Sequence, residues 1–268
     1  MGEHHQNAKD QGGMMRITPC AGLIVPPAAG LVPQDAHQLY AGRVKFIARG
    51  LGIGAVSPAG FEPVVGSVLD KARELRDAGA QVISLMGTSI SFYKGPEFTE
   101  SLRAAMQEAT GVPCTTMSHA IVAALRRLGI QRVAVATSYI DELNSRLVDY
   151  LVAAGFTVTA IRGMSITGVK EVGEVTTQAL IDLSQSVYQE DTSAQGVFIS
   201  CGGLLTLDAI KQLEDRLGLP ATASSPAGFW DVMRLGGWDA SSPEFGQLFA
   251  AGNTSSMPNV AAGTMKCR

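Results

Sequence analysis

Short apolar runs alternate along the chain with segments whose apolar residues recur every three or four positions. Apolar runs rich in Val and Ile are typical of buried strands, and the longer spacing is typical of helices that cover a sheet. Their alternation predicts an α/β fold with mostly parallel sheets. Predicted strands cover residues 22–25, 82–86, 112–115, 133–137, 157–161 and 197–201, with a short one near Ala221. Predicted helices cover residues 65–78, 98–109, 119–128, 140–154, 171–188 and 207–217.

The length of 268 residues is enough for two lobes, each with its own apolar core. We expect two similar lobes with the active site in the cleft between them. Lobe 1 is expected to comprise residues 17–127 and 226–250, and lobe 2 residues 128–225. Residues 1–16 and 251–268 are expected to be flexible tails.

The composition favours a globular protein with a small-molecule partner. Hydrophobic residues make up 46% of the chain and charged residues 17%, and the net charge is −3 without a run of Lys or Arg. Nucleic acid and membrane surfaces are therefore not expected as partners. No apolar stretch approaches the roughly 20 residues of a bilayer span, and the N-terminus lacks an apolar signal core. We expect a monomer in the cytoplasm.

Two predicted strands end in similar small and polar residues. The strand at 82–86 runs into Gly87, Thr88 and Ser89, and the strand at 197–201 ends at Cys201, before Gly202. Ligand sites of open α/β sheets lie at the carboxyl ends of parallel strands, so one half-site per lobe would form a cleft. The alternative is that these glycines only allow tight turns between strand and helix.

Several common motifs are missing. Residues 50–54 lack the GxGxxG spacing, and no clear strand-turn-helix unit is predicted around them. Residues 163–168 are one residue too long for a GxSxG elbow, and no P-loop or HExxH sequence occurs. The four cysteines form no CxxC pair, and His119 is interpreted as a helix-start residue without a catalytic role. A mechanism without a metal is therefore expected.

Six ordered segments resemble the arylmalonate decarboxylase family, which belongs to the aspartate/glutamate racemase superfamily. They are GLIVPPAAGLVP (22–33), SLMGTSISFY (84–93), TSYID (137–141), GVKE (168–171), SCGGLLTLDA (200–209) and SSPAGFW (224–230). The resemblance runs in order from about residue 22 to residue 249. It implies two α/β lobes and cofactor-independent decarboxylation of 2-aryl or alkenyl malonates that carry a second substituent, through an enediolate.

The resemblance also implies roles for residues at the two strand ends. Racemases of the superfamily carry cysteine at both ends, whereas this chain has Gly87 at the first and Cys201 at the second. Protonation by Cys201 alone would occur on one face and give a single enantiomer of a 2-arylalkanoate. As a general acid, Cys201 should rest as a protonated thiol, with a pKa near or above its usual value.

Further residues are implied as substrate contacts. A dioxyanion hole for the enediolate would comprise Thr88, Ser89, Tyr139 and Gly202. The apolar pocket for the departing carboxylate would comprise Pro26, Ile53, Val56, Met86, Ile90, Val169, Val172 and Gly203. Val172 stands where the decarboxylase that the chain resembles has a longer side chain.

Two alternatives remain open. An amino-acid racemase or cis-trans isomerase of the same superfamily would be expected to carry cysteine at both strand ends, and Gly87 argues against both. A non-catalytic carboxylate-binding module could use the same dioxyanion hole to hold an arylacetate. Release of CO2 from phenylmalonate distinguishes these alternatives from a decarboxylase. Cys20 and Cys114 are interpreted as structural residues, and Cys267 as a tail thiol.

Overall fold

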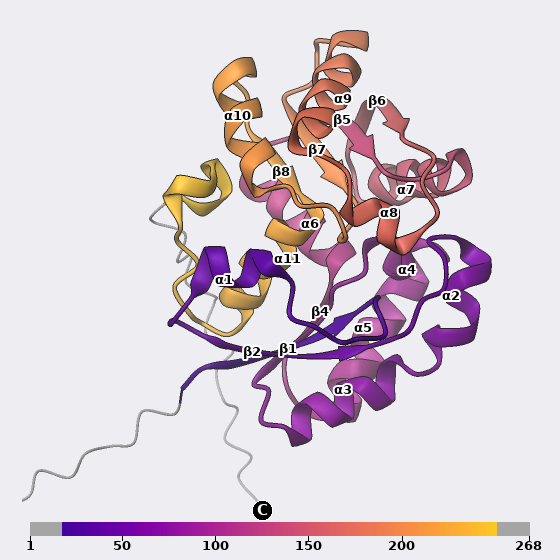
Figure 1. Cartoon of the computed structure of the whole chain (residues 1–268), viewed down its shortest axis with the longest axis vertical. Helices are drawn as coiled ribbons and strands as arrows, with labels where there is room; N and C mark the ends of the chain where they lie inside the picture. Colours follow the sequence, from indigo (N-terminus) through magenta and orange to yellow (C-terminus); the bar gives the residue numbers. More distant parts are fainter. Residues whose placement is uncertain (1–17, 251–268) are drawn as a thin grey trace, which may run out of the picture.

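Residues 18–250, which the computed structural model describes, contain two four-stranded parallel sheets (Figure 1). The first sheet has the strand order β2-β1-β3-β4 and the second the order β6-β5-β7-β8. Each half of the chain therefore folds with the same topology, and β7 is the counterpart of β3. The strands are β1 (Cys20–Val25), β2 (Lys45–Gly50), β3 (Val82–Leu85), β4 (Cys114–Thr116), β5 (Arg132–Thr137), β6 (Thr157–Gly163), β7 (Gly196–Ser200) and β8 (Ala221–Ala223).

Helices connect the strands and cover the sheets (Figure 1). They are α1 (Gln34–Tyr40), α2 (Pro58–Val65), α3 (Val68–Asp77), α4 (Thr88–Phe92), α5 (Pro96–Thr110), α6 (Met117–Arg127), α7 (Asp141–Ala153), α8 (Val169–Gly173), α9 (Thr177–Glu190), α10 (Leu207–Leu217) and α11 (Ser224–Leu235). Two 3₁₀ turns follow, Pro243–Phe245 and Gln247–Phe249. No helix within residues 18–250 is long and apolar enough to cross a bilayer.

The predicted α/β fold with parallel sheets is confirmed, but the sequence pattern missed one strand. Every residue of β1, β3 and β7 is buried, as expected for inner strands covered by helices on both faces. By contrast, β2 pairs only with β1 and is partly exposed, so its sequence KFIARG is not continuously apolar. Because β2 ends at Gly50, the prediction that no strand-turn-helix unit surrounds residues 50–54 was wrong. This segment links β2 to α2.

Two helix predictions were also wrong in extent. The segment predicted as one helix over 171–188 forms α8 and α9, which are separated by a break. The Thr176 hydroxyl accepts a hydrogen bond from the Ala179 N–H at 3.2 Å and so caps a new helix. The helix predicted over 65–78 corresponds to α3, which begins only at Val68, because α2 ends at Val65. Helices α1, α2, α4 and α11 were not predicted.

Helices α6 and α11 pack against each other between the two sheets (Figure 1). Gly228 in α11 permits this close approach, since a Cβ there would lie 2.8 Å from Met117 Sδ and 3.0 Å from Met86 Sδ. Helix α11 thus follows β8 of the second sheet but contacts α6 and β3 of the first half. The lobe boundaries given above stay a prediction, and the predicted tails lie outside the described residues.

Candidate active site

The site lies where the strand order of each sheet reverses. In the first sheet the chain moves from β1 to β2 on one side and then to β3 on the other, and in the second it does the same around β5. Ligands of open α/β sheets bind outside the carboxyl ends of the strands at such a reversal. A cavity of about 480 Å³ lies at this position, and residues of both halves line it.

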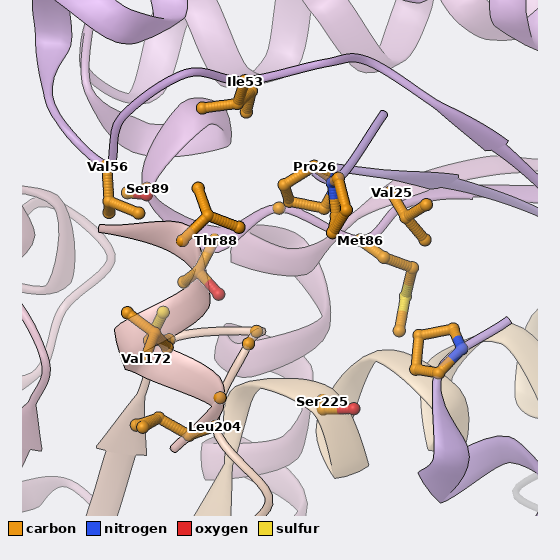
Figure 2. A pocket seen from close by; sticks show the side chains of 18 of the residues that line it. Val25, Pro26, Ile53, Val56, Met86, Thr88, Ser89, Val172, Leu204 and Ser225 are labelled. Carbon is orange, nitrogen blue, oxygen red and sulfur yellow. The ribbon is translucent and has the colours of Figure 1, made fainter. Parts of the chain in front are cut away.

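Almost all of the site residues expected from the sequence line this cavity. The lining includes Pro26, Ile53, Val56, Met86, Gly87, Thr88, Ser89, Ile90, Val169, Val172, Cys201, Gly202 and Gly203. Figure 2 shows Thr88 near the centre, with Ile53 and Val56 above it and Val172 and Leu204 below. The structure therefore brings these residues together, while their chemical roles stay predictions. Tyr139 is not part of the cavity wall.

A loop of the first half supplies apolar side chains to the cavity. Backbone hydrogen bonds fix this loop to the end of β1, because the Ile53 N–H donates to the Pro26 carbonyl at 3.0 Å. Farther along, the Val56 N–H donates to the Thr167 carbonyl at 2.9 Å, just before α8. The contact joins the two halves beside the cavity. It sets Val56 on the same wall as Val172 of α8.

Cys201 occupies a strained turn directly after β7. Its φ angle is 151°, in a region that side chains rarely adopt. Two hydrogen bonds hold the turn: the Cys201 N–H donates to Ser224 Oγ at 3.2 Å, and the Leu204 N–H donates to the Cys201 carbonyl at 3.3 Å. The fold therefore keeps the cysteine backbone in an unfavourable conformation at the edge of the cavity.

The environment of Cys201 favours a neutral thiol. Burial raises the pKa of Cys201, and the Ser138 hydroxyl, the Gly203 N–H and the Tyr139 hydroxyl oppose that shift. No Lys, Arg or His among the described residues contributes to lowering it. A thiol that stays protonated near neutral pH is able to donate a proton, as the expected role of Cys201 requires.

The first strand end offers hydroxyl and amide donors instead of a thiol. Gly87 precedes α4, and Thr88 and Ser89 form its first turn. Ser91 stabilises this turn, because its Oγ donates to the Thr88 carbonyl at 2.7 Å and lies 2.5 Å from Ser118 Oγ. Thr88 Oγ1 is buried and makes no hydrogen bond with any described residue. It is therefore available to a ligand in the cavity.

Tyr139 lies behind these donors. Its side chain is fully buried, its ring packs edge-on against Phe92 at 6.0 Å, and its hydroxyl accepts a hydrogen bond from Ser200 Oγ at 3.3 Å. Burial and the proximity of Cys201 raise the pKa of Tyr139 well above its usual value, and the Ser200, Thr88 and Ser89 hydroxyls act in the opposite direction. Tyr139 thus keeps its proton, which it can donate toward Thr88 and Ser89.

The sequence interpretation missed a polar part of the cavity wall formed by Asp35 and Ser225. Asp35 is 4% exposed, and its Oδ2 atom has no hydrogen-bond partner among residues 18–250. Burial raises the pKa of Asp35 to about 6; the Ser225 hydroxyl acts against this shift, and Asp208 adds to it. The sequence carries no signal for this position, because an Asp in the first turn of a short helix is ordinary.

His119 lies in the first turn of α6 and does not line the cavity. Its ring nitrogens lie 2.9 Å from Thr116 Oγ1 and 3.0 Å from Glu100 Oε2. These contacts agree with the interpretation of His119 as a helix-start residue. Cys20 and Cys114 are buried away from the cavity, and Cys267 lies outside the described residues.

A sequence profile of arylmalonate decarboxylases matches residues 21–249. The chain belongs to the arylmalonate decarboxylase family. It is 52% identical over 233 residues to the arylmalonate decarboxylase of Bordetella bronchiseptica. The aligned region covers 87% of this chain and 97% of that protein. The expected family resemblance is thereby confirmed, and the protein is an enzyme of the carboxy-lyase type.

Solved structures show the same relationship. A liganded double mutant of arylmalonate decarboxylase superposes with a TM-score of 0.85 at 51% identity, covering 87% of this chain and 99% of that one. The maleate isomerase Iso of Pseudomonas putida S16 superposes with a TM-score of 0.80 at 21% identity, covering 88% and 99%. The second match shows that the two-sheet fold is shared with maleate isomerases.

Proposed function

We propose that this enzyme decarboxylates 2-aryl or 2-alkenyl malonates that carry a second substituent, without a cofactor, and yields a single enantiomer of the 2-substituted acid. One observation carries the proposal: two equivalent strand ends meet at one cavity, and only that of β7 bears an acid, Cys201. Family membership supports the reaction type, and the asymmetry supports one-sided protonation.

The reaction begins with loss of one carboxylate. The bond between the α-carbon and that carboxylate breaks, CO2 departs, and the electron pair remains as an enediolate on the other carboxyl group. Apolar side chains such as Ile53, Val56 and Val172 favour this step, because they solvate neutral CO2 better than a carboxylate. Burial of charge in such a wall raises the energy of the substrate relative to the products.

Donors at the first strand end stabilise the enediolate. Thr88 and Ser89 line the cavity, and Tyr139 behind them keeps its proton. Preorganised donors of this kind are often the largest catalytic contribution, because they need no reorganisation as charge develops. Backbone N–H groups near Ser89 and Gly202 complete the proposed dioxyanion hole.

Cys201 completes the reaction. Its thiol transfers a proton to the α-carbon, the enediolate becomes a monocarboxylate, and a thiolate remains that regains a proton from solvent after product release. Since Gly87 offers no acid on the β3 side, the proton arrives on one face. The raised pKa of Cys201 agrees with this role, because a general acid must hold its proton until the intermediate forms.

Assay of the purified full chain with phenylmalonate and 2-methyl-2-phenylmalonate tests the proposal, after dialysis against a metal chelator and without added cofactor. We expect CO2 release from both substrates and one enantiomer of 2-phenylpropionate from the second. Phenylacetate binding without CO2 release would identify a carboxylate-binding module instead. Conversion of maleate to fumarate without decarboxylation would indicate an isomerase.

A further inference from the structure

The end of β5 places a serine beside Cys201. Strands β5 and β7 pair in parallel register, with Thr137 opposite Ser200, so the next residue on each strand, Ser138 and Cys201, are also neighbours. The Ser138 N–H donates to the Ser200 carbonyl at 3.4 Å, which extends the pairing beyond the strands. The Ser138 hydroxyl and the Cys201 thiol interact there, since the hydroxyl opposes the rise in the pKa of the thiol.

The Ser138 hydroxyl is fully buried and lacks a short hydrogen bond to any described residue, yet it is close enough to Cys201 to oppose the rise in the pKa of that thiol. The adjacent Thr137 differs, because its Oγ1 donates to Asn144 Oδ1 at 2.6 Å. A buried hydroxyl without a partner is costly, and unpaired groups of this kind in native structures are often explained by function. The sequence interpretation assigned no role to Ser138, although it lies in one of the matched segments.

Few polar groups surround the Cys201 sulfur. The Ser138 hydroxyl acts on it most strongly, followed by the Gly203 N–H from the turn after β7 and the Tyr139 hydroxyl from the segment after β5. No charged side chain among residues 18–250 affects its pKa. A thiolate formed here therefore depends on hydrogen-bond donors alone, and Ser138 is the free hydroxyl in register with it.

We propose that Ser138 is a positioning residue for Cys201: its hydroxyl turns to donate a hydrogen bond to the sulfur and stabilises the thiolate that forms as Cys201 gives up its proton. This inference rests on the function proposed above. The serine O–H stays intact throughout, and only the thiol proton moves to the α-carbon. The unpaired hydroxyl in the resting enzyme is thus held ready for the charge that appears during proton transfer.

The test measures the thiolate directly, without substrate. The rate of Cys201 alkylation by iodoacetamide is followed against pH by peptide mass spectrometry in the wild type, Ser138→Ala, Ser138→Thr and Ser184→Ala. Ser184 is a matched control, because it is also a fully buried serine without a short hydrogen bond to the described residues, but it lies in α9 and does not act on Cys201. Ser138→Gly replaces Ser138→Ala if the latter does not fold.

In Ser138→Ala the pKa of alkylation should rise by about one unit, the size expected for loss of a hydrogen bond to a charged atom. The basic limb of the pH profile of kcat/KM should move upward equally, and kcat should fall roughly tenfold with KM within about twofold. Ser138→Thr should restore most of both values, and Ser184→Ala should change neither.

An unchanged alkylation pKa in folded Ser138→Ala or Ser138→Gly would overturn the inference, whatever the effect on activity. A fall in kcat without a pKa shift would also overturn it, because it would assign Ser138 a packing role only. A shifted pKa in an enzyme that releases no CO2 would leave the contact standing and reject the proposed function instead.

Discussion

The two equivalent strand ends differ in a way that backbone conformation does not explain. Gly87, after β3, has an ordinary extended backbone with φ of −129°, which any residue can adopt. Cys201, after β7, has φ of 151°, which favours glycine. The glycine and the cysteine therefore stand in each other's preferred backbone conformations. Local conformation would place glycine at 201, so the thiol there is retained against backbone strain.

Chemistry, rather than local backbone preference, explains the residue at each strand end. Strained backbone conformations persist only where the surroundings hold them, and they cluster at functional sites. At the β7 end, Ser224 and the turn to Leu204 hold the strained cysteine. At the β3 end, a Cβ on Gly87 would lie 2.6 Å from Ile90 Cγ2, so a side chain there requires Ile90 to move. One end is built around an acid, and the other is built without one.

Removal of the thiol should have the largest effect. Cys201→Ala keeps the Cβ atom but loses the proton donor, so kcat for decarboxylation should fall by about 10²–10⁴-fold, the usual contribution of a general acid. Product binding and the unfolding temperature should stay close to those of the wild type. Steady-state CO2 release, calorimetry with phenylacetate and thermal unfolding measure these quantities.

Cys201→Gly is the matched control for backbone strain. It should be equally inactive but should unfold at a higher temperature than Cys201→Ala, because glycine adopts the positive φ freely. Retention of more than a few per cent of wild-type kcat in either variant would remove Cys201 from the role of proton donor.

Loss of a donor on the β3 side should have the next largest effect. Tyr139→Phe or Ser89→Ala should lower kcat roughly a hundredfold, as expected for one oxyanion-hole donor. Ser89 lines the cavity whereas Tyr139 lies behind it, so the variants compare a direct contact with an indirect one. Steady-state kinetics with phenylmalonate separates the effects on kcat and KM. A rise in KM alone would show that these groups only bind the substrate.

Addition of a thiol to the β3 end should weaken the asymmetry. Gly87→Cys is compatible with the backbone but displaces Ile90, which lines the cavity, so decarboxylation should slow by roughly tenfold, which corresponds to about 1.4 kcal/mol in the activation barrier. The variant should also racemise an optically pure 2-arylpropionate, because a thiol would then serve each face. Chiral chromatography and exchange of the α-proton in D2O measure this activity.

Gly87→Ala is the control for crowding, because it adds the same Cβ without a thiol. It should slow decarboxylation without racemisation. A folded Gly87→Cys enzyme that decarboxylates to one enantiomer and exchanges no α-proton would contradict the arrangement of two opposed faces.

The two ends also show how far the sequence allows prediction. The fully buried strands β3 and β7 were predictable, because parallel strands covered on both faces are continuous apolar runs. The motifs after them were recognisable by family resemblance, and the structure gathers them at one cavity. The half-exposed edge strand β2 was not predicted. It forms by pairing with β1, and local sequence does not encode that pairing.

Other site features depend on tertiary structure in the same way. Asp35 lies far from Ser225 in the sequence, and only the packing of α1 near α11 makes it a buried carboxyl. The strained backbone at Cys201 was not predictable either, because a cysteine in the sequence gives no indication of a positive φ angle. Tyr139 was expected in the dioxyanion hole and lies behind the cavity wall, because depth within a site follows from packing rather than from spacing.

The smallest effect on catalysis should come from replacing Asp35. This buried carboxyl lines the cavity together with two other ionisable residues, Cys201 and the exposed Lys170. Its pKa of about 6 in the folded protein exceeds the ordinary 3.8, so between about pH 4 and pH 6 the folded state holds a proton that the unfolded chain has lost. Stability therefore falls as pH rises through this window, and the cost persists above it.

Asp35→Asn should remove the cost and stabilise the protein at pH 8 by on the order of 1–3 kcal/mol, with little gain at pH 4. Thermal unfolding against pH measures this, with exposed Asp77→Asn as the control that should lack the trend. Because Asp35 is not expected to protonate the enediolate, the product should remain a single enantiomer. A racemic product would mean that Asp35 helps to restrict protonation to the face on which Cys201 lies, and that Cys201 alone does not determine the configuration of the product.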